Sequence, residues 1–305
     1  MVAETGKQIL LIANPCAGRK RASTELVDIV STLQAAGHQV AVHVTSGRGD
    51  AREVAAREAE RYEMVVVCGG DGTLNEVING LMRVERRPPI GYIPTGTTND
   101  FAASLGLPKK PKQAVENVLH GTPHPHDVGW FGGAYFSYIA SLGAFTRVSY
   151  TTPQKLKNTF GHMAYLLEGV KDIGGLKPFH LRVESGEESC EGEFLFGSVS
   201  NSTSVAGLFK LSPRDVKLDD GKFEVLLIRN PHNPVELQRI VTGLVHQKYD
   251  ERYVTFFHAE RLHVLTDPPL SWTLDGECGG EHQDIWIENR RHAIQIISEK
   301  HGTGA

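Results

Sequence analysis

The sequence contains few cysteines, and they form no recognisable pattern. Among its 305 residues there are only four, Cys16, Cys68, Cys190 and Cys278, and no two of them form a Cys-x-x-Cys pair. Spacings of this kind predict neither a disulfide framework nor a structural zinc site. We therefore expect a protein of a reducing compartment, the cytoplasm.

Long apolar runs and a strong charge of one sign are also missing. No apolar run approaches the ~18 residues that a membrane-spanning helix needs, and the polar opening from Met1 to Gln8 does not have the pattern of a signal peptide. The 32 Lys and Arg residues against 36 Asp and Glu residues give a formal charge of −4. This charge is unlike the basic surface of a dedicated nucleic-acid-binding protein, so we expect no nucleic-acid partner.

What the sequence does contain predicts two domains. In residues 1–124, apolar segments at 9–13, 39–44, 64–68 and 90–93 alternate with helical patterns such as 22–36 and 50–61. Strict alternation of this kind predicts an α/β domain with a parallel sheet. The boundary is expected in the turn-rich, proline-containing segment 121–125, which resembles a stiff linker.

Residues 125–305 have a different rhythm. Short segments of period two at 179–183, 223–228, 261–265, 284–287 and 293–297 are separated by turn residues such as 184–186, 219–221 and 267–269. This pattern predicts an antiparallel β-sandwich, whose last residues could return to the first domain. One helix is expected at 154–172, with an apolar stripe that could dock on a bilayer or pack against the sandwich.

The strongest local feature is the segment Val67 to Glu76, which reads Val-Cys-Gly-Gly-Asp-Gly-Thr-Leu-Asn-Glu. Its glycines would let the backbone approach phosphate oxygens closely, and the following helix would present unpaired N–H groups to them. Asp71 suits such a loop if magnesium neutralises the phosphates and the carboxylate helps to place the ion. The alternative is a tight strand-to-helix turn without a ligand. Neither a Walker loop nor a complete Gly-x-Gly-x-x-Gly is present.

Two further loops are expected at the same edge of the predicted sheet. Residues 14–20 follow the first strand, and residues 94–100 follow the fourth. Because loops at the carboxyl ends of parallel strands converge on one crevice, Asn14, Thr97 and Asp100 would face the same nucleotide as Gly70 and Thr73. Taken singly, each loop could be an ordinary Asx or Ser/Thr turn.

With these motifs in view, the chain resembles a known family. The sequence Gly-Gly-Asp-Gly-Thr-Leu-Asn-Glu at 69–76 resembles the signature of the diacylglycerol kinase catalytic fold, a superfamily that includes sphingosine and ceramide kinases. The segments 96–101, 217–221 and 274–277 match in order and spacing. The resemblance is greatest to soluble bacterial diacylglycerol kinases and related bacterial lipid kinases, and it covers essentially the whole chain. It implies ATP and Mg²⁺ bound in an active site between an α/β domain and a β-sandwich domain, with phosphate transferred to a lipid hydroxyl.

The resemblance also implies a role for each matching residue. The positions that match nucleotide-contacting segments are Asn14, Pro15, Cys16, Ala17, Gly18, Thr45, Gly69, Gly70, Asp71, Gly72, Thr73, Leu74, Asn75, Glu76 and Thr97. One departure is visible, because the family commonly has a hydroxyl residue where this chain has Ala17. That loop would therefore depend on backbone N–H groups.

The implied catalytic residues lie in both predicted domains. Asp71 and Asp100 match acidic residues of the catalytic network, acting through magnesium. Glu277 matches the proton acceptor for the attacking hydroxyl, with Asp275 beside it in support.

A second, structural magnesium site is implied by the segment 217–222. Lys217, Asp220 and Lys222 match its ligands, the two lysines through their backbone carbonyls, and Asp219 is expected to assist by hydrogen bonding.

These features predict an ATP- and Mg²⁺-dependent lipid kinase, with diacylglycerol as the leading acceptor and a peripheral, transient contact with a membrane surface. Another lipid, such as a sphingoid base or phosphatidylglycerol, and NAD are the alternative acceptors, since NAD kinases share a Gly-Gly-Asp-Gly loop. A catalytically silent nucleotide-binding module is the non-enzyme alternative, which the joint presence of Asp71, Asp100 and Glu277 disfavours. A homodimer is implied by the resemblance alone.

Overall fold

The computed structural model describes residues 6–97, 99–143, 177–186, 188–205, 209–212 and 216–299. The chain divides into two compact units, the first extending to Val128 and including the chain from Arg291, the second comprising Gly129–Arg290. The helix expected at 154–172 lies outside the described residues. No helix in the described ranges is long and apolar enough to cross a membrane.

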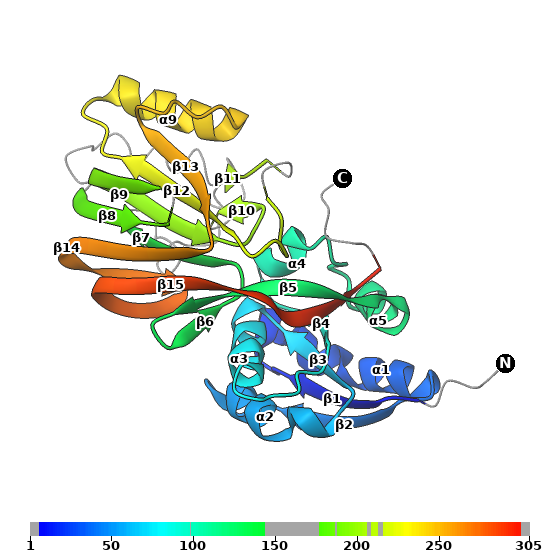
Figure 1. Ribbon diagram of the computed structural model, residues 1–305. Coiled ribbons are helices and arrows are strands. Elements are labelled where there is room, and N and C mark those ends of the chain that lie inside the picture. Colours follow the sequence, from blue (N-terminus) through cyan, green and yellow to red (C-terminus); the bar gives the residue numbers. More distant parts are fainter. Residues whose placement is uncertain are drawn as a thin grey trace. The chain divides into compact units, whose positions relative to one another are not determined.

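The first unit is an α/β structure (Figure 1), in which neighbouring strands from β2 to β4 pair in parallel. The strand order is β2-β1-β3-β4, with the end of β15 beside β4. Its elements are β1 (Gln8–Ala13), η1 (Ala17–Lys20), α1 (Arg21–Ala35), β2 (Gln39–Val44), α2 (Asp50–Glu58), η2 (Ala59–Arg61), β3 (Met64–Gly69), α3 (Asp71–Leu81), β4 (Ile90–Pro94), α4 (Asp100–Ser104) and α5 (Pro111–His120). Strands β5 (Thr122–Phe131) and β15 (Glu277–Ser298) contain residues of both units.

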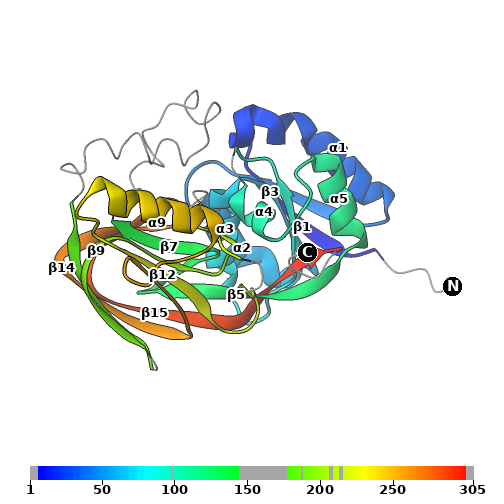
Figure 2. The same cartoon turned by 90° about the horizontal axis from the view of Figure 1, so that it is seen from above.

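The central strands of this unit are buried on both faces. All six residues of β3 are buried, as expected for a parallel strand with helices on either side. Helices α1 and α5 cover one face, where Ile29, Leu33 and Val115 pack against Ile9 and Leu11 of β1. The two helices lie side by side in Figure 2, while α2 and α3 form a second contacting pair. The parallel pairing of the strands aligns the carboxyl ends of β1, β3 and β4 at one edge of the sheet.

The second unit is rich in antiparallel β-structure, as its period-two patterns predict. Its strand order is β13-β12-β9-β7-β14-β15, with β8 also between β9 and β14 and β6 beside β5. Its elements are β6 (Ala134–Phe136), β7 (Ile139–Gly143), β8 (Phe179–Glu184), β9 (Ser189–Ser200), β10 (Ser204–Val205), β11 (Phe209–Lys210), β12 (Phe223–Arg229), α9 (Pro234–His246), β13 (Val254–Ala259) and β14 (Arg261–Leu274).

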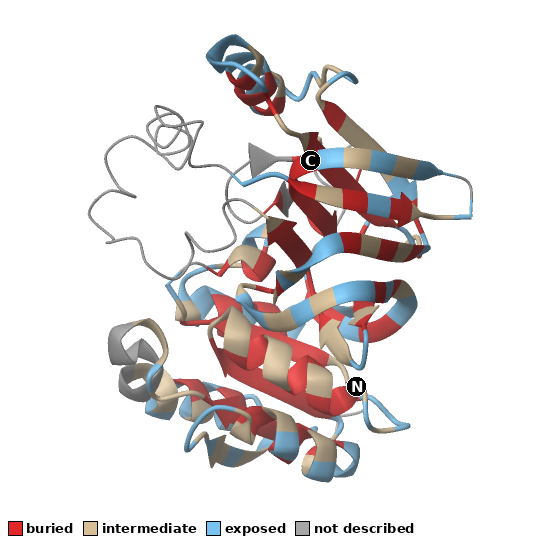
Figure 3. Ribbon diagram, turned by 90° about the vertical axis from the view of Figure 1, so that its left-hand side faces the viewer, coloured by how far each residue is buried: buried red, intermediate tan, exposed pale blue. Residues whose placement is uncertain are grey.

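The short strands β7 and β8 both lie between β9 and β14. β7 pairs with Phe196–Ser200 of β9, and β8 pairs with Ser189–Phe194 of the same strand. Both also pair with β14. The apolar core of the unit gathers around Phe136, Phe194, Phe223 and Trp272, and Figure 3 shows the buried residues concentrated along the strands.

Three local predictions were wrong. The expected linker 121–125 is a strand from Thr122 onward, the start of β5, which contains Pro123 and Pro125. The separate strands expected at 284–287 and 293–297 are parts of the single strand β15. The turn expected at 267–269 lies within β14, where the pairing register with β15 shifts between Leu265 and Leu270.

Candidate functional site

Three loops meet at the carboxyl ends of β1, β3 and β4. A Cβ atom on Gly96, after β4, would lie 2.6 Å from the Cα atom of Gly70, which precedes α3. A Cβ atom on Gly18 would collide with the carbonyl oxygen of Thr95, and Gly18 has a φ of +54°. The N–H of Thr95 donates to the carbonyl of Gly69 at 2.8 Å. The glycines therefore allow a backbone approach that no larger residue would permit.

Asn14 fastens the first loop to the second. Its backbone N–H donates to the carbonyl of Cys68 at 2.9 Å, and its side-chain amide donates to the hydroxyl of Thr73 at 2.9 Å. Its side-chain oxygen accepts from the N–H of Cys16 at 3.0 Å, so the loop forms an Asx turn. Asn14 and Thr73, predicted to face one nucleotide, are thus in direct contact.

The N-terminus of α3 lies at this meeting point. The helix starts at Asp71 after an extended Gly70. The N–H groups of Asp71 and Gly72 lie in the first turn, where the helix itself provides no carbonyl to accept their hydrogen bonds. Together with the helix dipole, these groups form a site suited to phosphate.

Asp71 orders the neighbouring loop. Its carboxylate oxygens accept from the backbone N–H groups of Asp100 at 3.0 Å and Phe101 at 3.3 Å, at the start of α4. The pKa of the Tyr92 phenol is raised, first by burial of the phenol and second by the Asp71 carboxylate. The pair Asp71 and Asp100, predicted to act together, is therefore brought together in the first unit.

Three residues of the predicted nucleotide segment have partners within the protein. The side chain of Leu74 is fully buried. Asn75 pairs along the helix with Asn79, whose amide donates to it. A carboxylate oxygen of Glu76 accepts from the N–H of Gly49 at 2.7 Å, ahead of α2. These three residues support the loop from within, whereas Cys16 and Thr97 are exposed at its rim.

The other predicted contacts occupy the same edge. Thr45 follows β2, and its N–H donates to the carbonyl of Ala13 at 2.9 Å. Pro15 and Ala17 are partly exposed beside Cys16. Burial raises the pKa of the Cys68 thiol, at the end of β3, to about 12, so this thiol stays protonated at neutral pH.

In the second unit, Asp275 anchors the turn between β14 and β15. Its buried carboxylate accepts from the N–H and hydroxyl of Ser137, both at 2.6 Å, and from the N–H groups of Tyr138 and Ile139, both at 3.0 Å. Burial raises the pKa of Asp275, and these four donors oppose the rise. The residue has a φ of +50°. Asp275 therefore fixes the turn that precedes β15, which starts at the exposed Glu277.

The predicted second metal segment is a polar turn before β12. A carboxylate oxygen of Asp220 accepts from the N–H of Lys222 at 3.0 Å, and the side chains of Lys217 and Lys222 are exposed. The described part of the chain contains no group of three or more His, Cys, Asp or Glu side chains placed to hold a metal. A cation here would depend on backbone carbonyls as well as carboxylates.

Glu224, two residues after this turn, is a buried acid that no motif in the sequence singles out. It is 1% exposed, and its Oε2 atom has no hydrogen-bond partner among the described residues. Burial first, and then Asp220, raise the pKa of its carboxyl group to about 9. A buried acid beside Asp220 fits an oxygen-ligated divalent cation. The signal in the sequence was an acidic residue inside the apolar segment 223–228.

Comparison with known proteins identifies the family to which this geometry belongs. Residues 8–131 match the model of the diacylglycerol kinase catalytic domain. A protein of Bacillus subtilis (strain 168) named diacylglycerol kinase is 34% identical over 297 residues, covering 96% of this chain and 97% of that protein. The chain belongs to the diacylglycerol kinase family. The diacylglycerol kinase of Staphylococcus saprophyticus is 35% identical over 296 residues, covering 96% of this chain and 95% of that protein.

Solved structures of the diacylglycerol kinase family share the fold. A Bacillus anthracis structure, described as a candidate diacylglycerol kinase, superposes with a TM-score of 0.82 at 26% identity and covers 97% of each chain. The α/β first unit and the β-rich second unit thus agree with the fold class expected from the sequence. Membership makes this chain a diacylglycerol kinase-like lipid kinase, and the matched segment 8–131 contains all three converging loops.

Proposed function

We propose that this protein transfers the γ-phosphoryl group of ATP to the hydroxyl of diacylglycerol, in a reaction that depends on Mg²⁺. The observation that carries the ATP assignment is the close approach of Gly70 and Gly96 at the N-terminus of α3. Backbone N–H groups there would bind phosphate oxygens. Phosphoryl transfer depends mainly on such positioning and on charge neutralisation.

The first unit would supply the nucleotide site. Asn14 and Thr73 hold two of the loops together through their side chains, and Asp71 holds the third through the N–H of Asp100. Magnesium, when bound, would neutralise the phosphate charge. The carboxylates of Asp71 and Asp100 are the residues proposed to hold it in this unit, since carboxylates suit hard cations.

The second unit, which we propose to be the β-sandwich domain of this family, would supply the general base. Glu277 is proposed to accept the proton of the attacking hydroxyl, a role that needs a carboxylate within hydrogen-bond reach of the acceptor. Asp275 would act only through the turn that it anchors, because both its oxygens are occupied by the segment Ser137–Ile139.

Diacylglycerol is proposed as the acceptor because the relatives from Bacillus subtilis and Staphylococcus saprophyticus carry that name. Such an acceptor lies in a bilayer, so we propose that the protein contacts the membrane surface peripherally and transiently. We also propose, from the family resemblance alone, that the protein forms a homodimer.

Label transfer from γ-labelled ATP tests the proposed function directly. The full-length chain is given Mg²⁺ and, in separate reactions, diacylglycerol in mixed micelles, a sphingoid base, phosphatidylglycerol or NAD. We expect the largest labelled product with diacylglycerol. Product from NAD alone would overturn the lipid assignment. Absence of product from every acceptor would favour a catalytically silent nucleotide-binding module.

A further inference from the structure

Glu224 is a buried acid in an otherwise apolar strand. Its neighbours Phe223, Val225 and Leu227 point into the core of the second unit. Because side chains alternate along a strand, Glu224 lies on the opposite face of β12. It is 1% exposed there, and its Oε2 atom has no hydrogen-bond partner among the described residues. A buried carboxyl group in this condition calls for a partner that supplies positive charge or a proton.

The turn 217–222 lies over this carboxyl group. Ser200, opposite Glu224 in the ladder, donates its hydroxyl to the backbone carbonyl of Glu224 at 3.3 Å. The next residue, Asn201, donates its amide to the carbonyl of Leu218 in the turn, also at 3.3 Å. The backbone N–H groups of Ser202 and Lys217 donate to the Glu224 carboxyl group, and the Asp220 carboxylate lies within electrostatic range of it. The turn therefore brings backbone groups and a second carboxylate close to Glu224.

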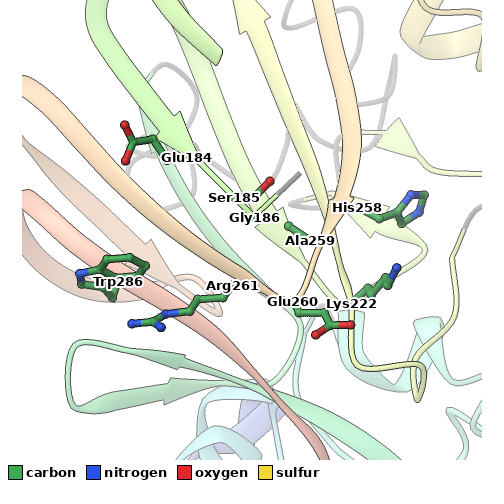
Figure 4. A pocket seen from close by; sticks show the side chains of 9 residues that line it. All are labelled: Glu184, Ser185, Gly186, Lys222, His258, Ala259, Glu260, Arg261 and Trp286. Carbon is green, nitrogen blue, oxygen red and sulfur yellow. The ribbon is translucent and has the colours of Figure 1, made fainter. Parts of the chain in front are cut away.

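The cations nearest in sequence are directed elsewhere. The side chains of Lys217 and Lys222 are exposed, and Lys222 lines an open pocket of about 530 Å³ (Figure 4). The cross-strand neighbour of Glu224 on β13 is His258, which lines the same pocket. Its ring packs edge-on against Phe256 at 5.3 Å. His258 is therefore the alternative to a cation as the positively charged partner of Glu224.

We propose that Glu224 supplies a carboxylate, in addition to that of Asp220, to a divalent-cation site formed with the backbone carbonyls of the turn 217–222. Carboxylate and carbonyl oxygens are the ligands that Mg²⁺, Mn²⁺ and Ca²⁺ prefer. The cation would displace the proton of the buried carboxyl group and take its place as the partner, so its binding stabilises the start of β12. The proposal thus adds one buried ligand, Glu224, to the structural magnesium site that the sequence predicts at 217–222.

The cation site rests on the Mg²⁺ dependence of the proposed function, but binding of an ion to it needs neither ATP nor lipid. Ion binding is therefore measured on the full chain without nucleotide, by titration with Mn²⁺ followed by electron paramagnetic resonance. The variants are Glu224→Gln, which keeps the shape of the side chain and removes its charge, and Asp220→Asn. The matched control is Glu260→Gln, because Glu260 is an exposed acid in the connection between β13 and β14.

We expect one Mn²⁺ ion to bind to the wild type, with about tenfold or greater loss of affinity in Glu224→Gln and in Asp220→Asn and no change in Glu260→Gln. The double variant Glu224→Gln/Asp220→Asn should lose little more than either single variant, since both residues act on one ion. Equal affinity in Glu224→Gln and the wild type would overturn the proposal. So would a wild type that binds no Mn²⁺ without ATP, the result expected if His258 is the partner of Glu224.

Thermal unfolding gives an independent readout. In MgCl₂ the wild type should melt at a higher temperature than in EDTA, because a ligand of the folded state stabilises it. Glu224→Gln should lose this difference, whereas Glu260→Gln should keep it. A full magnesium response in Glu224→Gln would contradict the proposal. If Glu224→Gln does not fold, Glu224→Met, whose apolar side chain suits a buried position, is measured in its place by the same criteria. Label transfer by the wild type is assayed in parallel, so that failure of the kinase assignment is seen separately from failure of ion binding.

Discussion

The substitution Asp275→Asn would convert one of two occupied acceptor oxygens into a donor. One oxygen accepts from the N–H and hydroxyl of Ser137, and the other from the N–H groups of Tyr138 and Ile139. The asparagine amide would turn toward Ser137, whose hydroxyl can rotate to accept, and the backbone N–H of Ser137 would lose its acceptor. A buried donor left unpaired costs about 1–3 kcal/mol, and the remaining bonds lose their charge assistance. We therefore predict a loss of roughly 2–4 kcal/mol in the free energy of unfolding of the second unit.

Urea unfolding followed by tryptophan fluorescence measures this loss. All three tryptophans, Trp130, Trp272 and Trp286, lie in the second unit, so the signal reports on that unit. Ser137→Ala is the matched control. It removes one hydroxyl donor and leaves the backbone N–H in place, so we expect a smaller loss of about 1–2 kcal/mol. If Asp275→Asn unfolds at the same urea concentration as the wild type, or is less affected than Ser137→Ala, Asp275 does not anchor the turn.

Three further predictions concern the first unit. Gly96→Ala should weaken ATP binding, measured by calorimetry, by about tenfold or more, because its Cβ atom would lie 2.6 Å from the Cα of Gly70; an unchanged Kd would contradict the close approach. N-ethylmaleimide should label the exposed Cys16 but not the buried Cys68, and Mg-ATP should slow the labelling of Cys16, a protection whose absence would exclude a nucleotide beside that loop. Asp50→Asn should cost about 1 kcal/mol of stability at neutral pH. Hydrogen bonds from Ser46 hold the pKa of Asp50 below its ordinary value of 3.8, so the loss should be present above that pH and disappear at lower pH; urea unfolding that shows the same loss at pH 2.5 and pH 7 would contradict this assignment.

The edge of the first unit at which three loops meet was predictable because it depends on local patterns. Short apolar strands and intervening helices define a parallel sheet, and the carboxyl ends of its strands lie at one edge. The contact between Asn14 and Thr73 follows from this geometry, although the two residues are 59 positions apart. The engagement of Asp71 by the N–H groups of α4 did not follow, because it depends on where a short helix starts after the glycine loop.

The roles of Asp275 and Glu224 could not be predicted from local patterns. Asp275 finds its donors at Ser137–Ile139, more than 130 residues earlier in the chain, so its burial depends on the pairing of distant strands. Glu224 occupies a strand position whose burial is set by tertiary packing rather than by its own polarity. The prolines of 121–125 predicted a linker. The strand that starts there could not be predicted from local patterns, because one of its partners, β15, lies at the far end of the chain.

Transfer of label from γ-labelled ATP to diacylglycerol, compared between the wild type and Glu277→Gln, tests whether the chain is a lipid kinase whose general base is Glu277. Glu281→Gln is the matched control, because Glu281 is an exposed acid on the same strand. We expect labelled lipid from the wild type and from Glu281→Gln. In Glu277→Gln we expect turnover to be slower by about 100-fold or more with unchanged ATP binding, the scale of general-base catalysis. Wild-type turnover in Glu277→Gln would remove Glu277 as the base, and a wild type that labels no lipid would contradict the proposed lipid kinase function.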